Sequence, residues 1–296
     1  MRKKLLSNGL SREQNVAKMI ADYSQGGKAW DVPNCEKFLD IPYGTESKRQ
    51  CIDIYKPLGE GPFPCLVEIH GGGWWTGDRK DSGMTDVLWA LDHGYAVVSM
   101  GYRLTDEGVW PDQWNDVTAA LEKLLEVGPG LGLDTARMCA TGGSAGTTLS
   151  LLLALKSKKY KCAIMLAPIL DFAAIRSQFE EVGIARSKMF GYPDEDTSME
   201  AMLMGGSVEQ VPGICAELTP INFVDEKCLP IFLYHGMLDK ATPYLQTVEF
   251  ARQAAEKTGD AERVQYKLLE ATGHSGGEYK AQWLKDERLE FLKKYL

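Results

Sequence analysis

Two kinds of hydrophobic pattern alternate along this chain from residue 64 onward. The first is a short, nearly continuous apolar run, typical of strands covered on both faces; such runs span 64–70, 95–102, 136–143, 160–167, 229–236 and 263–270. The second is a longer stretch with helical periodicity; these stretches lie at about 81–92, 112–127, 145–157 and 244–258, and from about 278 onward. Strands that alternate with helices predict an α/β fold with a mostly parallel central sheet flanked by helices.

The first 60 residues have another pattern. Four apolar residues recur at helical spacing within 11–25 and predict a short amphipathic helix: Val16, Met19, Ile20 and Tyr23. Two strand-like runs follow at 36–43 and 50–57 with a glycine-containing turn between them, which predicts an antiparallel hairpin. We therefore expect a helical N-terminal segment over residues 1–33 and one main domain over 34–296.

One connection between predicted strands is much longer than the others. More than fifty residues separate the runs at 160–167 and 229–236, and they are rich in methionine, glycine and acidic residues. Loops of this length are usually functional lids or binding segments. Because nothing in it alternates strongly enough to form its own sheet, we expect a small cap insertion at about 171–228 rather than a second domain.

Composition and charge argue against several classes of partner. With 44% hydrophobic and 25% charged residues, the chain has the composition of an ordinary globular protein. Its net charge of −8 argues against nucleic acid or an anionic membrane as partner, since both attract basic surfaces. No run approaches the roughly 20 apolar residues of a membrane helix. The basic cluster at 2–4 resembles the start of a signal peptide, but the apolar run after it ends before Ser7. We therefore expect a cytoplasmic protein, and a secreted one only if a signal peptide has been removed.

The seven cysteines show no C-x-x-C spacing. Cys65, Cys139 and Cys162 lie within apolar runs, where a free thiol behaves as a small buried hydrophobe. We expect reduced thiols, as in cytosolic proteins; the alternative is a disulfide between Cys35 and Cys51, which lie on successive predicted strands. No His, Cys and Asp residues cluster with the spacing of metal ligands, so we expect neither a metal nor another cofactor.

The strongest local signal is the sequence Gly142-Gly143-Ser144-Ala145-Gly146, a G-x-S-x-G pattern between a predicted strand and a predicted helix. In this context the serine lies on a sharp turn that needs small neighbours and presents the hydroxyl at the carboxyl end of the sheet. The positive end of the helix dipole lies where negative charge would develop. Ser144 is therefore a candidate nucleophile; the alternative is a glycine-rich helix entrance with a capping serine.

A nucleophilic serine needs a base, and the chain contains only four histidines. In hydrolases with this turn, the acid and then the histidine follow the serine along the chain. His70 and His93 precede the serine, and His235 ends a predicted strand ahead of the best-placed acid. His274 lies in a glycine-rich loop after the last predicted strand and is therefore the candidate base.

The candidate acid is Asp239, which shortly follows the run at 229–236 in a turn closed by Pro243. A buried aspartate bonded to the second imidazole nitrogen would fix the tautomer of the base and stabilise the imidazolium. Asp171 is the alternative, because some hydrolases take the acid one strand earlier.

Three glycines and two tryptophans follow the strand predicted at 64–70. G-x-S-x-G hydrolases bind the reaction's oxyanion through the N–H after the nucleophile and through N–H groups of an earlier loop. We expect Gly72, Gly73 and Ala145 to supply these groups, with glycine needed because a Cβ would obstruct the substrate. Trp74 is expected to pack under the loop and Trp75 to face a bound ligand; plain core packing is the alternative for both.

The motifs HGGGW, GYRL, GGSAG, HGMLDKATP and GHSGG occur in this order. Over residues 48–296 the chain resembles the α/β-hydrolase esterase/lipase family, which includes acetyl esterases and bifunctional acetylxylan/feruloyl esterases. The resemblance implies an α/β-hydrolase fold. It also implies a nucleophile, an acid, a base and three oxyanion donors: Ser144, Asp239, His274, Gly72, Gly73 and Ala145.

We therefore predict a serine carboxylesterase without a cofactor that hydrolyses short-acyl esters, of acetyl or aryl and feruloyl type, through an acyl-enzyme. The expected partner is a small-molecule or carbohydrate ester. Two alternatives stay open: an arylformamidase-type amidase that uses the same triad, and a non-catalytic binding protein with the same fold. The second is disfavoured because such proteins typically lack the serine or the histidine.

Overall fold

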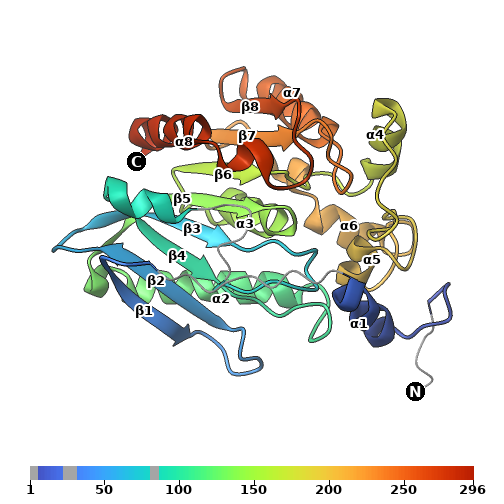
Figure 1. Ribbon diagram of the computed structural model, residues 1–296, viewed down its shortest axis with the longest axis horizontal. Helices are drawn as coiled ribbons and strands as arrows, with labels where there is room; N and C mark the ends of the chain where they lie inside the picture. The colour runs from blue at the N-terminus through green and yellow to red at the C-terminus, as the bar shows by residue number, and fades with distance from the viewer. Residues whose placement is uncertain (1–5, 23–31, 81–86) are drawn as a thin grey trace.

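An eight-stranded sheet forms the centre of the computed structural model, which describes residues 6–22, 32–80 and 87–296 (Figure 1). The strands are β1 Cys35–Pro42, β2 Cys51–Pro57, β3 Phe63–Ile69, β4 Ala96–Met100, β5 Leu133–Gly143, β6 Cys162–Leu166, β7 Ile231–Gly236 and β8 Val264–Leu269. Their order in the sheet is β1-β2-β4-β3-β5-β6-β7-β8. The strands from β3 to β8 are parallel, whereas β2 is antiparallel to both β1 and β4. The predicted α/β architecture and the predicted hairpin are confirmed.

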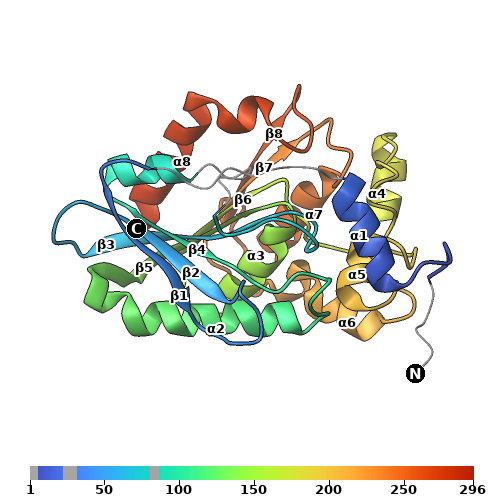
Figure 2. The same cartoon turned by 60° about the horizontal axis from the view of Figure 1, so that its bottom comes forward.

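Helices cover both faces of the sheet. On one face lie α2 Asp112–Val127, α3 Ala145–Ser157 and α7 Leu245–Thr258; on the other lie the 3₁₀ helix η1 Leu88–His93 and α8 Gln282–Tyr295. Figure 2 shows α2 and α8 on opposite sides of the strands. Successive residues of a central strand therefore enter different hydrophobic cores: Val98 packs in the core beneath α2 and α3, and Val97 packs in the core beneath α8. Burial on both faces explains why these strands are almost continuously apolar.

The register of the parallel strands brings their carboxyl ends to one edge of the sheet. Ile69 of β3 lies opposite Gly142 of β5, and the next residue of β5, Gly143, lies opposite Leu166 of β6. The loops that follow β3, β5, β7 and β8 therefore begin at the same edge. These four loops carry the candidate oxyanion glycines, Ser144, Asp239 and His274.

The long connection between β6 and β7, which we call the cap (residues 171–228), carries four short helices: α4 Ile175–Val182, α5 Met199–Met204, α6 Pro212–Leu218 and η3 Pro220–Phe223. Figure 1 shows α4, α5 and α6 beyond the carboxyl ends of the strands. The N-terminal helix α1 Arg12–Asp22 lies beside α5, and its Arg12 guanidinium donates to the Met202 carbonyl at 3.3 Å. The N-terminal segment thus contacts the cap. Residues 1–5 and 23–31, which the prediction also assigned to this N-terminal segment, lie outside the described residues.

Three predicted elements differ in detail from the structure. Strand β8 lies at the edge of the sheet, so its residues between Val264 and Leu269 are only partly buried or, at Tyr266, exposed, unlike those of the central strands. The helix predicted at 81–92 is seen only as η1, and residues 81–86 lie outside the described part of the chain. The last helix, α8, begins at Gln282, after the short 3₁₀ helix η4 Gly277–Lys280.

The hairpin register excludes the alternative disulfide. Cys35 lies opposite Pro57 and Cys51 lies opposite Pro42, so the two thiols are at opposite ends of the β1–β2 ladder. A disulfide requires Cα atoms within about 7 Å of each other. All seven cysteines are free thiols in this structure. Within the described ranges, the structure contains no helix both long and apolar enough to cross a membrane.

Candidate active site

Ser144 occupies a strained turn between β5 and α3. Gly143 is the last residue of β5 and Ala145 is the first residue of α3. The backbone of Ser144 has φ 52° and ψ −128°, a conformation that L-residues rarely adopt, and its N–H donates to the Leu166 carbonyl at 2.9 Å. This geometry matches the strand-to-helix turn that presents a nucleophile at a sheet edge.

Close packing against β3 explains the small residues around the serine. A Cβ on Gly146 would lie 2.0 Å from the Ile69 carbonyl oxygen, and a Cβ on Gly142 would lie 2.9 Å from the Gly146 backbone. The Thr147 hydroxyl donates to the Ser144 carbonyl at 2.5 Å and accepts from the Ile169 N–H at 3.0 Å. The turn is therefore held from two sides, by the end of β3 and by the segment after β6.

The structure brings three sequence-predicted residues into one hydrogen-bonded chain. His274 Nε2 lies 2.8 Å from Ser144 Oγ, and His274 Nδ1 lies 2.7 Å from Asp239 Oδ2. Because the carboxylate can only accept, Nδ1 carries the proton and Nε2 is free to accept the proton of the serine hydroxyl. This is the arrangement that activates a serine for nucleophilic attack.

Asp239 is almost fully buried, and its carboxylate is saturated with hydrogen bonds. Oδ1 accepts from the N–H groups of Ala241 and Thr242 at 2.7 and 3.0 Å, and Oδ2 accepts from the Thr242 hydroxyl at 3.0 Å. Burial by itself raises the pKa of Asp239, but the neighbouring imidazoles of His274 and His235 outweigh it and hold that pKa well below its usual range. Asp239 is therefore ionised at neutral pH.

Asp171, the alternative acid, has a different role in the structure. Its Oδ1 accepts from the N–H groups of Ala173 and Ala174 at 3.1 and 3.3 Å, directly before α4. Burial raises the pKa of Asp171. The carboxylate bonded to His274 is that of Asp239.

The glycine loop after β3 leaves backbone donors free at the edge of the sheet. Gly72 and Gly73 have φ angles of 107° and 62°, and within the described residues neither N–H has a hydrogen-bond acceptor. Ala145 begins α3, so its N–H lacks an acceptor within the helix. These are the three groups that we expect to bind an oxyanion.

The packing of this loop explains its glycines and corrects one expectation. A Cβ on Gly73 would lie 1.8 Å from Trp75 Nε1, and a Cβ on Gly72 would lie 2.2 Å from the Thr76 carbonyl oxygen. The fold of the loop itself therefore requires glycine at both positions. Trp74 is fully buried and packs 5.6 Å from the Phe172 ring, as expected, but Trp75 is also buried, with 1% of its surface exposed. The expectation that Trp75 faces a ligand is not met, because its side chain fills the space under Gly73.

The other three histidines take no part in the hydrogen bond between Ser144 and His274. His70 stacks on Tyr102 with ring centroids 4.4 Å apart, and its Nδ1 donates to the Gly71 carbonyl at 2.8 Å. Burial lowers the pKa of His70 to about 4, so the ring is neutral at pH 7 and supports the start of the glycine loop.

His235 lies inside β7, 3.4 Å from Asp239. We did not predict this contact, and the four-residue spacing between the two residues is the only signal for it in the sequence.

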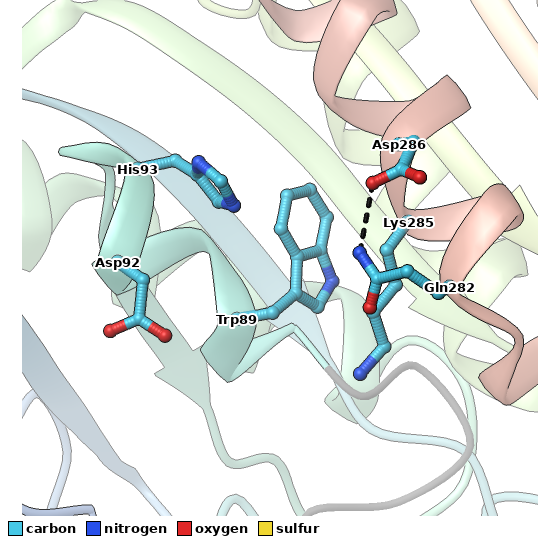
Figure 3. Close-up of a pocket in the computed structure, with 6 residues that line it drawn as sticks. All are labelled: Trp89, Asp92, His93, Gln282, Lys285 and Asp286. Carbon is cyan, nitrogen blue, oxygen red and sulfur yellow. Dashed lines mark hydrogen bonds between the residues drawn. The ribbon is translucent and has the colours of Figure 1, made fainter.

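His93 lies in a separate polar hollow of about 340 Å³ (Figure 3). The residues that line this hollow come from η1 and α8: Trp89, Asp92, His93, Gln282, Lys285 and Asp286. Because η1 leads into the start of β4, the hollow lies at the amino edge of the sheet, away from Ser144. None of the predicted site residues lines it.

A buried ion pair connects the cap to the loop that carries Asp239. The Arg186 guanidinium binds Glu200 Oε1 at 2.6 Å, with both side chains fully buried, and its Nε donates to the Ala241 carbonyl at 2.9 Å. The N–H of Ser187 donates to the Lys240 carbonyl at 2.8 Å. Phe190, four residues after Arg186, packs with its ring centroid 6.4 Å from that of His274. The cap therefore contacts both the acid loop and the candidate base.

We expect Glu200→Ala to lower the free energy of unfolding by about 3–5 kcal/mol, because the Arg186 charge would remain buried without its partner. The matched control is Glu195→Ala, which removes a pair with Arg176 at 3.0 Å on the outer side of the cap. Because this pair is exposed to solvent, its loss should cost at most about 1 kcal/mol. Denaturant unfolding measures both changes, and equal costs would contradict the role assigned to the buried pair.

Within the described residues, no group of three His, Cys, Asp or Glu side chains could hold a metal ion. A candidate nucleophile, a candidate base, a buried candidate acid and unpaired N–H donors together suit acyl transfer.

Comparisons with known proteins place named esterases among the relatives of this chain. The BD-FAE family model matches residues 52–254. The chain is 25% identical over 252 residues to esterase LipQ of Mycobacterium tuberculosis, a match that covers 80% of this chain and 56% of LipQ. It is 30% identical over 170 residues to the ethyl acetate hydrolase of Pseudomonas putida, covering 53% of this chain and 52% of that hydrolase. The chain spans about half the length of the curated relatives that it matches.

A solved structure shares the fold over most of the chain. A truncated form of a carbohydrate esterase from gut microbiota matches with a TM-score of 0.77 and 21% identity, over 91% of this chain and 99% of that one. The likeness confirms the predicted α/β-hydrolase fold.

Proposed function

The chain belongs to the BD-FAE family, and on this premise we propose that it is a serine carboxylesterase that forms an acyl-enzyme. The observation that carries the proposal is the contact of His274 with both Ser144 Oγ and Asp239 Oδ2, at 2.8 and 2.7 Å. A buried carboxylate, an imidazole and a serine hydroxyl aligned in this way are the parts that acyl transfer requires.

In the proposed reaction, Ser144 Oγ attacks the ester carbonyl while His274 Nε2 takes the hydroxyl proton. The carbonyl oxygen becomes an oxyanion, which the N–H groups of Gly72, Gly73 and Ala145 would stabilise. Each such donor typically contributes about 3 kcal/mol to the transition state. His274 then gives the proton to the departing alcohol. Water attacks the acyl-enzyme by the same route, which releases the acid and restores the serine hydroxyl.

We further propose that the substrates are short-acyl esters, of acetyl or small aryl type, on carbohydrate alcohols. Two similarities support this class: one relative is named an ethyl acetate hydrolase, and the structurally similar protein is a carbohydrate esterase. The cap supports it as well. Glu180 and Glu181 of α4 are exposed, and Arg176 pairs with Asp194 and Glu195 at 2.8 and 3.0 Å, so this part of the cap is charged. Such a surface differs from the exposed apolar patch with which a protein docks on a membrane.

We expect kcat/KM to be highest for p-nitrophenyl acetate or butyrate and to fall about tenfold or more by the octanoate ester. A methylene that fits contributes only about 1 kcal/mol, whereas one that clashes costs more, so specificity falls steeply once the acyl site is full. The measurement is kcat/KM for the acetate, butyrate, octanoate and palmitate esters. A maximum at octanoate or longer would contradict the short-acyl proposal and favour a lipase.

A substrate panel tests the function itself. Acetylated xylan, methyl ferulate, p-nitrophenyl acetate and N-formylkynurenine are assayed with and without a serine-directed phosphonate. We expect the protein to hydrolyse the esters, and we expect the phosphonate to abolish this turnover. Preference for N-formylkynurenine would make the protein an amidase, and no turnover on any of the four would favour a binding protein.

A further inference from the structure

A second imidazole lies against the carboxylate of the candidate acid. His235 is the fifth residue of β7 and is fully buried. Its Nε2 lies 3.4 Å from Asp239 Oδ2 and 3.1 Å from both the carbonyl oxygen and the hydroxyl of Thr242. Its Nδ1 lies 2.9 Å from the hydroxyl of Thr247, on α7. Every polar atom of this ring therefore has a partner, and the ring connects α7 to the loop that holds Asp239.

The hydrogen bonds define one tautomer of His235. The Thr242 hydroxyl donates its only proton to Asp239 Oδ2, so toward His235 its oxygen accepts. The Thr242 carbonyl also accepts only, and a proton must therefore lie on His235 Nε2. The Thr247 hydroxyl is the partner of Nδ1, at 2.9 Å. The other tautomer would place the Nε2 lone pair against a carbonyl and a carboxylate.

The oxygen that these groups contact, Asp239 Oδ2, also accepts the hydrogen bond from His274. Asp239 Oδ2 accepts from His274 at 2.7 Å and from the Thr242 hydroxyl at 3.0 Å, while Nε2–H of His235 holds that hydroxyl. We propose that His235 is a positioning residue: through its Nε2–H it fixes Thr242 and the Asp239 carboxylate in the orientation that binds His274. The proposal deepens the proposed function, on which its kinetic consequence rests.

Burial makes this positioning effective. His235, Thr242 and Asp239 are buried, so an oxygen among them that loses its donor is left unsatisfied at a cost in free energy. The ionisable groups around His235 are Asp239 and, beyond it, His274, and the Tyr279 hydroxyl accepts from the N–H of the neighbouring Gly236 at 2.8 Å. The two imidazoles both favour the ionised carboxylate, in agreement with the depressed pKa of Asp239.

The test compares two substitutions of similar volume. His235→Gln keeps an N–H donor near the position of Nε2, whereas His235→Met fills the space without a donor. We expect His235→Met to lower kcat by about 10- to 100-fold with little change in KM, and His235→Gln to recover most of this loss. Both variants can lower Tm, so Tm alone does not separate positioning from packing.

Proton NMR gives a readout independent of turnover. The His274 proton bonded to Asp239 is expected as the most downfield resonance in wild type and in His235→Gln, and to shift upfield or vanish in His235→Met. Thr242→Val and Thr242→Ser form a second pair. Valine removes the hydroxyl that lies between His235 and Asp239 and serine keeps it, so this pair replaces the first if His235→Met does not fold. His93→Gln, in the hollow at the amino edge of the sheet, is the assay control and should match wild type.

Equal kcat and equal downfield resonances in the Met and Gln variants would overturn the positioning role and leave His235 as a packing residue. Failure of the proposed function has a different signature. In that case wild type turns over no ester, while the downfield resonance still depends on the donor at position 235.

Discussion

Replacement of Ser144 by alanine is expected to lower kcat for p-nitrophenyl acetate by about a million-fold while the protein stays folded. The change deletes one hydroxyl, whose hydrogen-bond partner is His274 Nε2, and leaves the backbone bond from Ser144 N–H to the Leu166 carbonyl in place. Without Oγ no acyl-enzyme can form. The remaining rate would come from the oxyanion donors and from substrate binding.

The control for this substitution is Ser150→Ala. Ser150 lies in α3, the helix that follows Ser144; it is buried and donates its hydroxyl to the Thr141 carbonyl at 2.9 Å. The same chemical change there should leave kcat within a few-fold of wild type. Circular dichroism and denaturant unfolding establish that both variants fold, and phosphonate labelling followed by mass spectrometry locates the reactive serine. A folded Ser144→Ala protein with a tenth of wild-type activity would place the nucleophile elsewhere.

Asp239→Asn is expected to lower kcat by about ten-thousand-fold. The amide oxygen would still accept from the N–H groups of Ala241 and Thr242, which places the NH₂ group toward His274. His274 would then have to accept at Nδ1 and carry its proton on Nε2, where it can no longer take the proton of Ser144. The side-chain volume is almost unchanged, so the loss reports the tautomer rather than packing.

Asp171→Asn is the matched comparison. An asparagine at 171 can still accept from Ala173 and Ala174 N–H, and we expect kcat within about threefold of wild type. The two variants are compared by kcat/KM across pH 5 to 9 with one ester. A crippled Asp171→Asn together with a mild Asp239→Asn would reverse the assignment of the acid.

Local patterns are sufficient to predict the α/β alternation. The spacing of apolar residues shows whether a helix or strand is buried on one face or on both, and this spacing lies within a few residues of the chain. The helices at 112–127 and 145–157 begin and end where the periodicity places them. The turn at Ser144 is predictable for a similar reason, since its geometry depends on neighbours within two or three residues. The hairpin is predictable from its turn, but its register is not, and the register decides that Cys35 and Cys51 lie apart.

The partners within the site depend on contacts between distant segments. His274 lies 130 residues after Ser144 and 35 residues after Asp239, and only the order of the strands in the sheet brings these three loops to one edge. In the sequence Asp239 is the candidate acid and Asp171 the alternative, because each follows a strand predicted to end at that edge. The structure distinguishes them, since the Asp171 carboxylate binds the first turn of the cap and the Asp239 carboxylate reaches His274.

The sequence by itself therefore determined the α/β class of this protein, the strand–serine–helix turn and, by elimination among four histidines, His274 as the candidate base. Only the tertiary structure decided that Trp75 packs beneath the glycine loop and that His235 approaches Asp239. The physical reason is the distance along the chain between the residues that interact. Periodicity and turn geometry are set by neighbouring residues, whereas the direction of a side chain is set by whatever the folded chain packs against it.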